Sequence, residues 1–253
     1  MEIIFLGTGT GIPSIRRGSP AVLLLHGKTT ILVDCGTGTL RQLAKINLSF
    51  NRIDYLLFTH FHPDHTGDLV AYLFASRNKT AFSRRDPVRI IGPRGLLQLY
   101  ENLHKAFGRS VEPPKDVVSF EELPLERHDF SLADLVVSAF PTPHTRSSLG
   151  YRFRTAQGGS VAVTGDTGYS PELAENLKGV DLLVTECSFP DSQKVEGHLT
   201  PSLAGQFASE AEAGSLALNH FYPEVEGQDI INFAGREFKG RLYITEDLQK
   251  ITL

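Results

Sequence analysis

The hexapeptide His-Phe-His-Pro-Asp-His, which begins at His60, constrains this chain more than any other feature. It follows an apolar run that ends at Phe58, so it is expected on a turn at a strand end. On an extended backbone, side chains two positions apart point the same way, so His60 and His62 can bind one ion. Asp64 and His65 follow the turn-setting proline and can face a second ion. The hexapeptide therefore predicts a site for zinc or a similar divalent metal.

Three further candidate ligands each follow a short apolar, β-prone run. His144, Asp166 and His220 stand after runs that include 135–137, 161–163 and 216–218. Each is expected at a strand end, where loops carry chemistry on a rigid scaffold. Alone, each residue would more often be a cap or a turn residue. With the hexapeptide they complete two ligand sets, which are His60, His62 and His144 for one ion, Asp64, His65 and His220 for the other, and Asp166 as the bridge.

In this order the ligands resemble those of the metallo-β-lactamase superfamily, above all its ribonuclease Z branch and the related phosphodiesterases. The opening loop Phe5-Leu-Gly-Thr-Gly-Thr-Gly-Ile-Pro-Ser14, the segment 32–43 and the joint Ile91-Gly-Pro-Arg-Gly-Leu96 carry the same resemblance. It extends from about residue 3 to about residue 245. Related enzymes are commonly homodimers, so the resemblance also implies a homodimer.

Strand-like and helical stretches alternate along the chain, with no repeat and no linker. Pro171 and Pro201 follow Ser170 and Thr200, which predicts two capped helix starts. The pattern predicts a single α/β domain over residues 1–253, a four-layer αββα sandwich with the metal site at one edge. The expected strands are 2–6, 20–25, 29–34, 54–59, 88–91, 116–120, 134–140, 149–154, 160–164, 181–185, 215–219 and 241–244, and the clearest helices are near 38–46, 67–76, 94–106, 171–178, 201–213 and 228–238.

The ligand types favour hydrolysis. Two ions about 3.5–4 Å apart can bridge a hydroxide, lower its pKa and clamp the oxygens of an in-line displacement. The resemblance implies that Asp64 also hydrogen-bonds this nucleophile. Redox di-iron relatives carry Glu where this chain has His62, and true β-lactamases usually carry Cys near the position of Asp166. We therefore expect two zinc ions, with manganese or iron possible, and no antibiotic cleavage.

Asp34 ends its predicted strand and is interpreted either as the outer carboxylate that orients a ligand imidazole or as an ordinary turn residue. Glu186 and His198 resemble a pair of the ribonuclease Z branch in which the histidine serves the leaving oxygen. Glu186 would raise the pKa of His198 and make it a cationic donor. The alternative is that His198 caps the helix that begins at Pro201. Ser147 and Ser148 are weaker candidates for substrate contacts, with a simple turn as the alternative.

The ribonuclease Z proteins that process tRNA precursors carry a long arm, which the resemblance places between the positions of His144 and Asp166. That interval holds no room for an arm here. We therefore expect a phosphodiesterase acting on cyclic nucleotides or short RNA ends rather than on tRNA precursors. The alternatives are a dizinc lactone or thioester hydrolase and a metal-binding module without catalysis.

Composition supports a single soluble domain. Hydrophobic residues make up 41% of the chain, and no apolar run reaches the ~18 residues that span a bilayer. Met1 leads straight into a strand, so no signal peptide and a cytoplasmic location are expected. Cys35 and Cys187 lack a pairing pattern and are expected to be buried and unpaired.

The net charge of −4 argues against a protein coated for nucleic acid. Residues 77–115 nevertheless hold nine basic and three acidic side chains. This segment is either a solvated helical face or a collar that attracts an anionic substrate. In a homodimer, such a collar could face the active site of the partner subunit.

Overall fold

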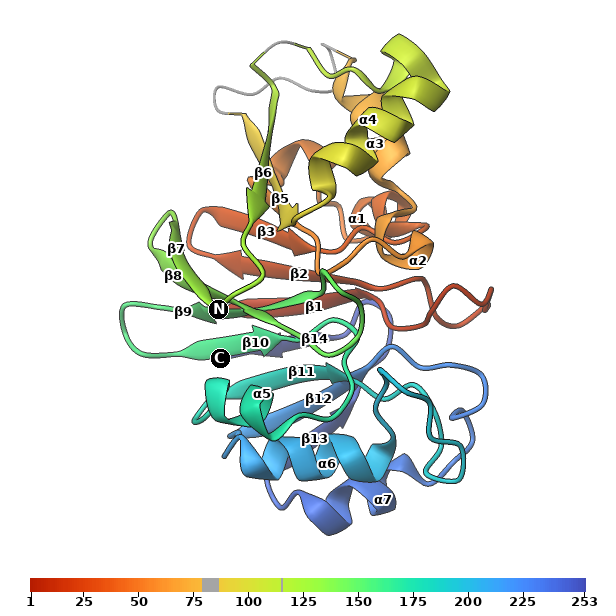
Figure 1. The fold of residues 1–253 in the computed structure, drawn as a ribbon, viewed down its shortest axis with the longest axis vertical. Coiled ribbons are helices and arrows are strands. Elements are labelled where there is room, and N and C mark those ends of the chain that lie inside the picture. The colour runs from red at the N-terminus through yellow and green to blue at the C-terminus, as the bar shows by residue number, and fades with distance from the viewer. Residues whose placement is uncertain (79–86, 115) are drawn as a thin grey trace.

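Two seven-stranded sheets form the centre of the protein (Figure 1). The computed structural model describes residues 1–78, 87–114 and 116–253. The strand order is β14-β1-β2-β3-β4-β5-β6 in the first sheet and β13-β12-β11-β10-β9-β8-β7 in the second. The strands are β1 (Glu2–Gly7), β2 (Ala21–His26), β3 (Thr29–Val33), β4 (Tyr55–Leu57), β5 (Val88–Pro93), β6 (Val118–Leu123), β7 (His128–Leu132), β8 (Leu135–Pro141), β9 (Leu149–Arg154), β10 (Ser160–Val163), β11 (Leu182–Glu186), β12 (Ser215–Asn219), β13 (Arg241–Ile244) and β14 (Lys250–Thr252).

Both sheets change from antiparallel to parallel pairing part-way across. In the first sheet β14, β1, β2 and β3 pair antiparallel, and β3 to β6 pair parallel. In the second sheet β7 to β10 pair antiparallel, and β10 to β13 pair parallel. Parallel strands need crossover connections, which place helices on the outer faces. In this chain, helices stand in the sequence between the parallel strands and form these crossover connections.

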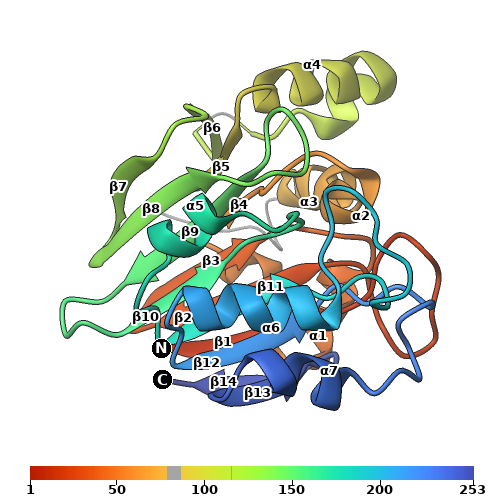
Figure 2. The ribbon, with the colours of Figure 1, turned by 60° about the horizontal axis from the view of Figure 1, so that its bottom comes forward.

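The helices cover the outer faces of both sheets. Figures 1 and 2 show α3 and α4 on the side of the first sheet and α6 and α7 on the side of the second. The α-helices are α1 (Thr39–Lys45), α2 (Pro63–Thr66), α3 (Leu69–Ser76), α4 (Leu96–Phe107), α5 (Pro171–Asn176), α6 (Pro201–Glu210) and α7 (Ile230–Glu237), with short 3₁₀ turns at Phe50–Arg52 and Gly108–Val111.

Three apolar clusters hold the layers together. One lies between the sheets and includes Phe5, Tyr151 and Phe153, all fully buried. The second packs α5, α6 and α7 on the second sheet, and the third packs α1, α3 and α4 on the first sheet. A core between two sheets with one core on each outer face is the αββα sandwich that the sequence predicts. Cys35 and Cys187 are buried and unpaired, as expected.

Three short elements were not predicted from the sequence. Strand β7 has five residues at the end of its sheet and only two apolar ones, Phe130 and Leu132, so its alternation is too short to detect. Strand β14 has only three residues and is held by pairing with β1 across the whole length of the chain. Helix α2 is a single turn that begins at Pro63 inside the hexapeptide. The capped starts of α5 and α6 are confirmed, because Ser170 and Thr200 accept from the backbone N–H groups of Leu173 and Leu203.

The strand directions bring the candidate ligands to one edge of the sandwich. Parallel strands have their carboxyl ends at a common edge, so the residues after β3, β4, β10, β11 and β12 lie there. Strand β8 runs antiparallel to β9, which runs antiparallel to β10, so β8 ends at this edge as well. Both sheets therefore contribute loops to one site.

Gly165 shows how closely the two sheets approach at this edge. Its φ is 62°, and a Cβ there would stand 2.6 Å from the Cβ of Thr59 in the opposite sheet. A backbone shift at this point would move the flanking residues His60 and Asp166 together. Gly158 also has a positive φ, 95°, but a Cβ there would meet no atom within 4 Å.

We predict that Gly165→Ala lowers the free energy of unfolding by about 1–3 kcal/mol more than Gly158→Ala. Both variants place a side chain at positive φ, so the difference between them isolates the clash with Thr59. Urea denaturation followed by circular dichroism measures both. Equal losses would mean that the sheets separate at this edge without cost.

Candidate metal centre

Four potential ligand atoms converge at the first half of the site. His60 Nε2 lies 3.0 Å from His62 Nδ1, and His144 Nε2 lies 3.2 Å from the same atom. Asp166 Oδ2 lies 3.6 Å from His144 Nε2 and 3.9 Å from His60 Nε2. The four residues come from the ends of β4, β8 and β10, so the group exists only when both sheets are assembled.

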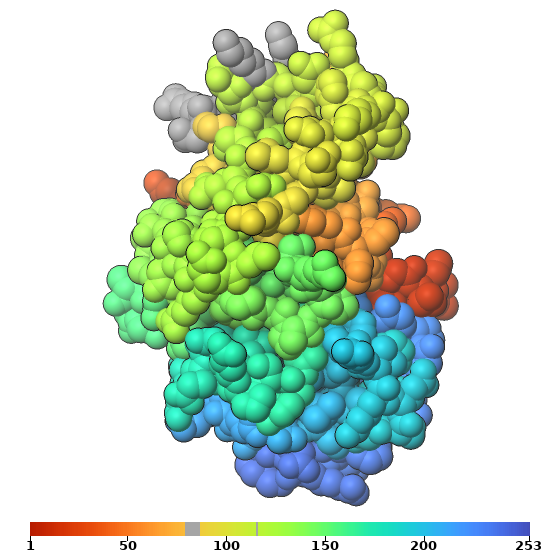
Figure 3. Space-filling model, viewed as in Figure 1, coloured from red at the N-terminus to blue at the C-terminus, as the bar shows by residue number. Residues whose placement is uncertain are grey.

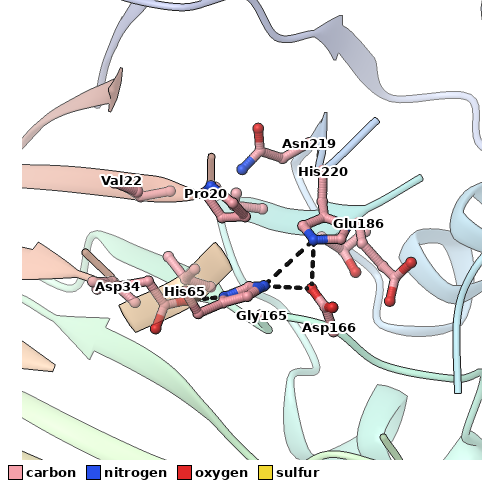
Figure 4. A pocket seen from close by; sticks show the side chains of 14 residues that line it. Pro20, Val22, Asp34, His65, Gly165, Asp166, Glu186, Asn219 and His220 are labelled. Atoms are coloured by element: carbon pink, nitrogen blue, oxygen red, sulfur yellow. Dashed lines mark hydrogen bonds and ion pairs between the residues drawn. The ribbon is translucent and has the colours of Figure 1, made fainter. Parts of the chain in front are cut away.

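The second half of the site uses the other oxygen of Asp166. Asp166 Oδ1 lies 3.3 Å from His65 Nε2 and 3.3 Å from His220 Nε2, and these two nitrogens are 3.4 Å apart. Asp64 Oδ2 lies 3.5 Å from His220 Nε2. Figure 4 shows His65 and His220 both pointing at Asp166, with the three atoms at the corners of a triangle. The seven predicted ligands are therefore together, with one oxygen of Asp166 in each half.

The donor atoms fit divalent metal ions. Ligands about 2.0–2.1 Å from a tetrahedral zinc lie about 3.3–3.4 Å from one another, which is close to the separations in both halves. Asp166 is 3% exposed, and its Oδ1 has no hydrogen-bond partner among the described residues. A buried carboxylate oxygen without a donor is costly, and a cation at this position would satisfy it.

The outer ring nitrogens fix the orientation of four imidazoles. His65 Nδ1 donates to Asp34 Oδ2 (2.8 Å), and His144 Nδ1 donates to the Gly197 carbonyl (2.9 Å). His60 Nδ1 lies 3.1 Å from the Thr59 hydroxyl, and His220 Nδ1 lies 3.0 Å from the Ser188 hydroxyl. Each Nδ1–H is thereby used, and each Nε2 presents its lone pair to the site, which is the arrangement of metal-ligating histidines. His62 differs, because its Nδ1 faces the site.

Asp34 occupies the place of an outer carboxylate. The backbone N–H of Thr59 donates to Oδ1 (2.8 Å), and the Thr59 hydroxyl and His65 Nδ1 donate to Oδ2 (2.8 Å each). Asp34 is buried and adopts a φ of 61°, which is unusual for a residue other than glycine. His220 does the same at 56°. Positive φ at these two positions is local strain of the kind that gathers at functional sites.

The charges of the site shift several pKa values. Burial and the neighbouring His65 lower the pKa of His60 to about 2, so its imidazole is neutral. Burial alone would lower the pKa of His65, but Asp166 and Asp34 outweigh it and raise the pKa well above its usual value. Burial opposes ionisation of Asp64, yet the hydrogen bond with His220 and the charge of His65 lower its pKa to about 2. The carboxylates of Asp34 and Asp166 thus favour a positive charge at His65, and a bound cation would supply this charge in place of the proton.

His198 lies beside the first half of the site and is bonded to Glu186. His198 Nδ1 is 3.0 Å from each carboxylate oxygen of Glu186, which is fully buried. Burial lowers the pKa of His198, but the hydrogen bond and the charge of Glu186 outweigh it, and the pKa is raised. The His198 and His144 rings are 4.8 Å apart. The cap of α6 is Thr200, so the alternative role of His198 as that cap is not observed.

Sequence reasoning missed Ser188, which connects Glu186 to the second half of the site. Its hydroxyl donates to Glu186 Oε2 and accepts from His220 Nδ1. The Leu199 backbone N–H (3.2 Å) and the Thr167 backbone N–H (2.7 Å) complete the shell of Glu186. One carboxylate thus orients both His198 and a ligand imidazole. Ser188 stands two positions after Glu186, and this spacing was the one signal available in the sequence.

An aromatic wall also escaped the sequence analysis. The rings of Phe189 and Tyr222 stack at 4.7 Å, and Tyr222 lies 5.6 Å from His220 and 6.2 Å from His198. Burial and the charges of Asp64 and Asp166 raise the pKa of Tyr222 to about 12, so its hydroxyl stays protonated. The wall places aromatic rings beside both His198 and His220.

Comparison with known proteins identifies this arrangement. A family model described as a β-lactamase superfamily domain matches residues 29–221. The chain belongs to the β-lactamase superfamily. Ribonuclease Z of Mycolicibacterium gilvum (strain PYR-GCK) is 30% identical over 278 residues, which cover 99% of this chain and 96% of that protein. Ribonuclease Z of Mycobacterium bovis (strain BCG / Pasteur 1173P2) is 28% identical over 276 residues, covering 99% and 98%.

Solved structures agree with this assignment. The short form of human tRNase Z has a TM-score of 0.80 at 26% identity, covering all of this chain and 99% of its own. The metallo-β-lactamase fold protein YhfI from Bacillus subtilis has a TM-score of 0.86 at 22% identity, covering 99% and 98%, and supports the fold alone. The four-layer architecture and the resemblance to the ribonuclease Z branch are confirmed.

The remaining predicted residues of this superfamily member lie at or near the site. Ser148 is buried, and its hydroxyl accepts from the Thr145 backbone N–H (3.0 Å) within the turn after His144. Ser147 is half-buried in the same turn, where its backbone N–H bonds to the Thr145 hydroxyl (3.3 Å). Their contacts with a substrate stay predictions.

The predicted basic collar lies only partly within the described residues. Arg89 pairs with Glu121, and Arg109 lies 3.9 Å from Glu112. Lys79, Arg84, Arg85 and Lys115 fall outside the described residues. The collar therefore stays a prediction. Among the described residues, no helix is both long enough and apolar enough to cross a membrane.

We predict that Asp34→Asn lowers the metal affinity of the protein by about 10–100-fold. An amide has one acceptor oxygen where the carboxylate has two, so either the Thr59 backbone N–H or the His65 ring N–H would face an NH2 group. Asp181→Asn is the control, because both Ser160 groups that donate to Asp181 use the same oxygen. Competition with a chelating dye measures both variants. Equal affinities would contradict the orienting role of Asp34.

Proposed function

We propose that this protein is a metal-dependent hydrolase that cleaves phosphodiester bonds with two bound ions, zinc foremost and manganese or iron possible. His60, His62, His144 and Asp166 would hold one ion, and Asp64, His65, His220 and Asp166 the other. The bound ions would supply a nucleophile at neutral pH and stabilise negative charge on the phosphoryl oxygens. The observation that carries the proposal is the Glu186-bonded His198 beside this donor set.

His198 and Glu186 favour a substrate whose leaving group departs as an alkoxide. Because Glu186 occupies Nδ1 and holds the pKa of His198 above its usual value, the ring carries a proton on Nε2 to donate. The leaving group of a phosphodiester departs as an alkoxide, and a proton donor aids its departure. A thioester expels a thiolate, which needs no such donor. A lactone expels an alkoxide as well, so the preference for a phosphodiester over a lactone is supported by the similarity to the ribonuclease Z proteins. Asp64, on the opposite side of His220, orients the attacking group.

The choice of substrate depends on the long arm of the tRNA-processing enzymes, for which this chain has no room. Between His144 and Asp166 the structure has only β9, β10 and the hairpin turn 155–159 that joins them. The alignment with the M. gilvum ribonuclease Z spans 278 positions, whereas this chain has 253 residues, so at least 25 positions have no residue of this chain. We infer that nucleotides or short RNA ends are cleaved in preference to tRNA precursors. A homodimer in the cytoplasm stays part of the proposal.

Two ions and the bridging role of Asp166 are tested by metal analysis. We predict that the wild type binds two ions per chain, that His144→Ala and His220→Ala each lose one, and that Asp166→Ala loses both. The reason is that each histidine serves one half of the site, whereas Asp166 offers one oxygen to each. Mass spectrometry of the metal content and anomalous scattering give the number and the place. A single ion in the wild type, or ions placed elsewhere, would refute the assignment.

We predict that His198→Ala keeps its metal and lowers kcat by about 10²–10⁴-fold on 2′,3′-cyclic nucleotides. The loss shrinks on bis(p-nitrophenyl) phosphate, whose leaving group is already a good anion and needs less protonation. Glu186→Gln gives a milder loss of the same kind, because it removes the charge that keeps the ring protonated.

The matched control is Thr200→Ala. It removes the observed cap of α6 and is expected to cost roughly 1 kcal/mol of stability with little change in activity. Equal rates for the wild type and His198→Ala on the cyclic nucleotide, with unchanged metal content, would remove His198 from the mechanism.

A further inference from the structure

Two adjoining hollows lead away from the metal centre on the Asp64 side. The first is lined by Asp64, Pro63 and the loop between β1 and β2. The second lies between that loop and α1 and is lined by Arg41 and Lys45. Both share Arg17 and Thr37 as lining residues, so they adjoin each other and are treated as one groove. Figure 3 shows the loop projecting in red beside the orange surface of the region around α1 and α2. We call the combined hollow the α1 groove.

The α1 groove carries positive charge without a counter-ion. Arg41 and Lys45 stand four residues apart on the same face of α1, and both are exposed. Neither has a hydrogen-bond or ion-pair partner within residues 1–78, 87–114 and 116–253. Two carboxylates line the groove. Asp64 belongs to the metal centre, and the two oxygens of Asp247 already accept from Thr8, Gly18 and Gln42.

The wall of the groove is held in place rather than loose. Asp247 binds the backbone N–H groups of Thr8 (3.0 Å) and Gly18 (2.7 Å), at the two ends of the loop. Arg17 bonds to the Thr245 carbonyl and to Glu226, and it lies 4.2 Å from the ring centroid of Phe221. Arg17 is therefore structural, and Glu226 offsets its charge. The unpaired cations that remain free for a ligand are Arg41 and Lys45.

A third hollow lies beside the first half of the centre. It is lined by His144, His198 and Arg146 and has a volume of about 680 Å³. Because His198 is assigned to the leaving oxygen, this hollow would receive the leaving part of the substrate. The remaining part of the substrate then extends past Asp64 into the α1 groove.

We propose that the α1 groove binds the phosphates of a single-stranded nucleic acid on the side of the scissile bond away from His198, with Arg41 and Lys45 as the phosphate contacts. The inference rests on the proposed phosphodiesterase function and deepens it, because it favours a linear strand over a cyclic nucleotide. A cyclic nucleotide has one phosphate, which would bind at the metal centre. Neither Arg41 nor Lys45 would then have a phosphate to contact. A strand places further phosphates along the groove, where a concave basic surface concentrates positive potential.

The test compares Arg41→Gln/Lys45→Gln with the control Lys28→Gln/Arg241→Gln, which removes one lysine and one arginine that are exposed and lie outside the groove. Fluorescence anisotropy measures the binding of a short, unstructured RNA with phosphorothioate linkages to the metal-loaded proteins over a range of salt. We expect weaker binding for the groove variant alone, with a slope of log affinity against log salt that is smaller by about 1.4, or 0.7 for each lost phosphate contact. Hydrolysis of bis(p-nitrophenyl) phosphate, which is too short to reach the groove, should be unchanged.

Equal RNA affinity for the wild type and the groove variant at every salt concentration would overturn the proposal, as would an equal loss in the control. Failure of the wild type to hydrolyse any phosphodiester would instead defeat the proposed function. Binding that depends on Arg41 and Lys45 would survive that result, since anisotropy does not require turnover.

Discussion

The structure depends on one buried carboxylate. Asp166 is almost wholly buried and lies between four imidazoles, with one oxygen directed to each half of the site. A buried charge is tolerated only when it is paired, and here the partners come from both sheets. The sheets must therefore meet in one register for the charge to be compensated. This requirement links the packing of the sandwich to the assembly of the metal centre.

The close packing of the two sheets at this edge also links the fold to the geometry of the metal centre. Gly165 leaves no room for a side chain against Thr59, and these residues directly precede Asp166 and His60. Asp34 then fixes Thr59 through two hydrogen bonds and His65 through a third. A displacement at any one of these positions would move ligands of both halves. Stability and function are thus set by the same contacts.

Glu186 joins the candidate proton donor to the ligand shell. It bonds directly to His198 and, through Ser188, to His220. Because one carboxylate positions both rings, the distance between donor and metal centre is fixed by a short chain of hydrogen bonds. The hollow by His144 adjoins His198, and the α1 groove adjoins Asp64. A bound strand would therefore have a defined direction across the centre. A strand crossing the centre would present its leaving oxygen to His198.

The sequence by itself determined the candidate ligands, the strand-end positions and the αββα class. Three imidazoles and a carboxylate in six residues are a local pattern, and apolar runs before His144, Asp166 and His220 mark strand ends whatever the tertiary fold. The caps at Ser170 and Thr200 are equally local, since each bond spans three residues.

Only the tertiary structure decided how these pieces combine. Ser188 gained its role because β11 and β12 are neighbours in the sheet, and Tyr222 did so because its ring packs beside His198. Strand β14 exists because β1 offers it a partner more than two hundred residues away. The α1 groove likewise joins a loop after β1 to a helix after β3. Contacts between distant segments depend on packing geometry, which no local pattern of residues encodes.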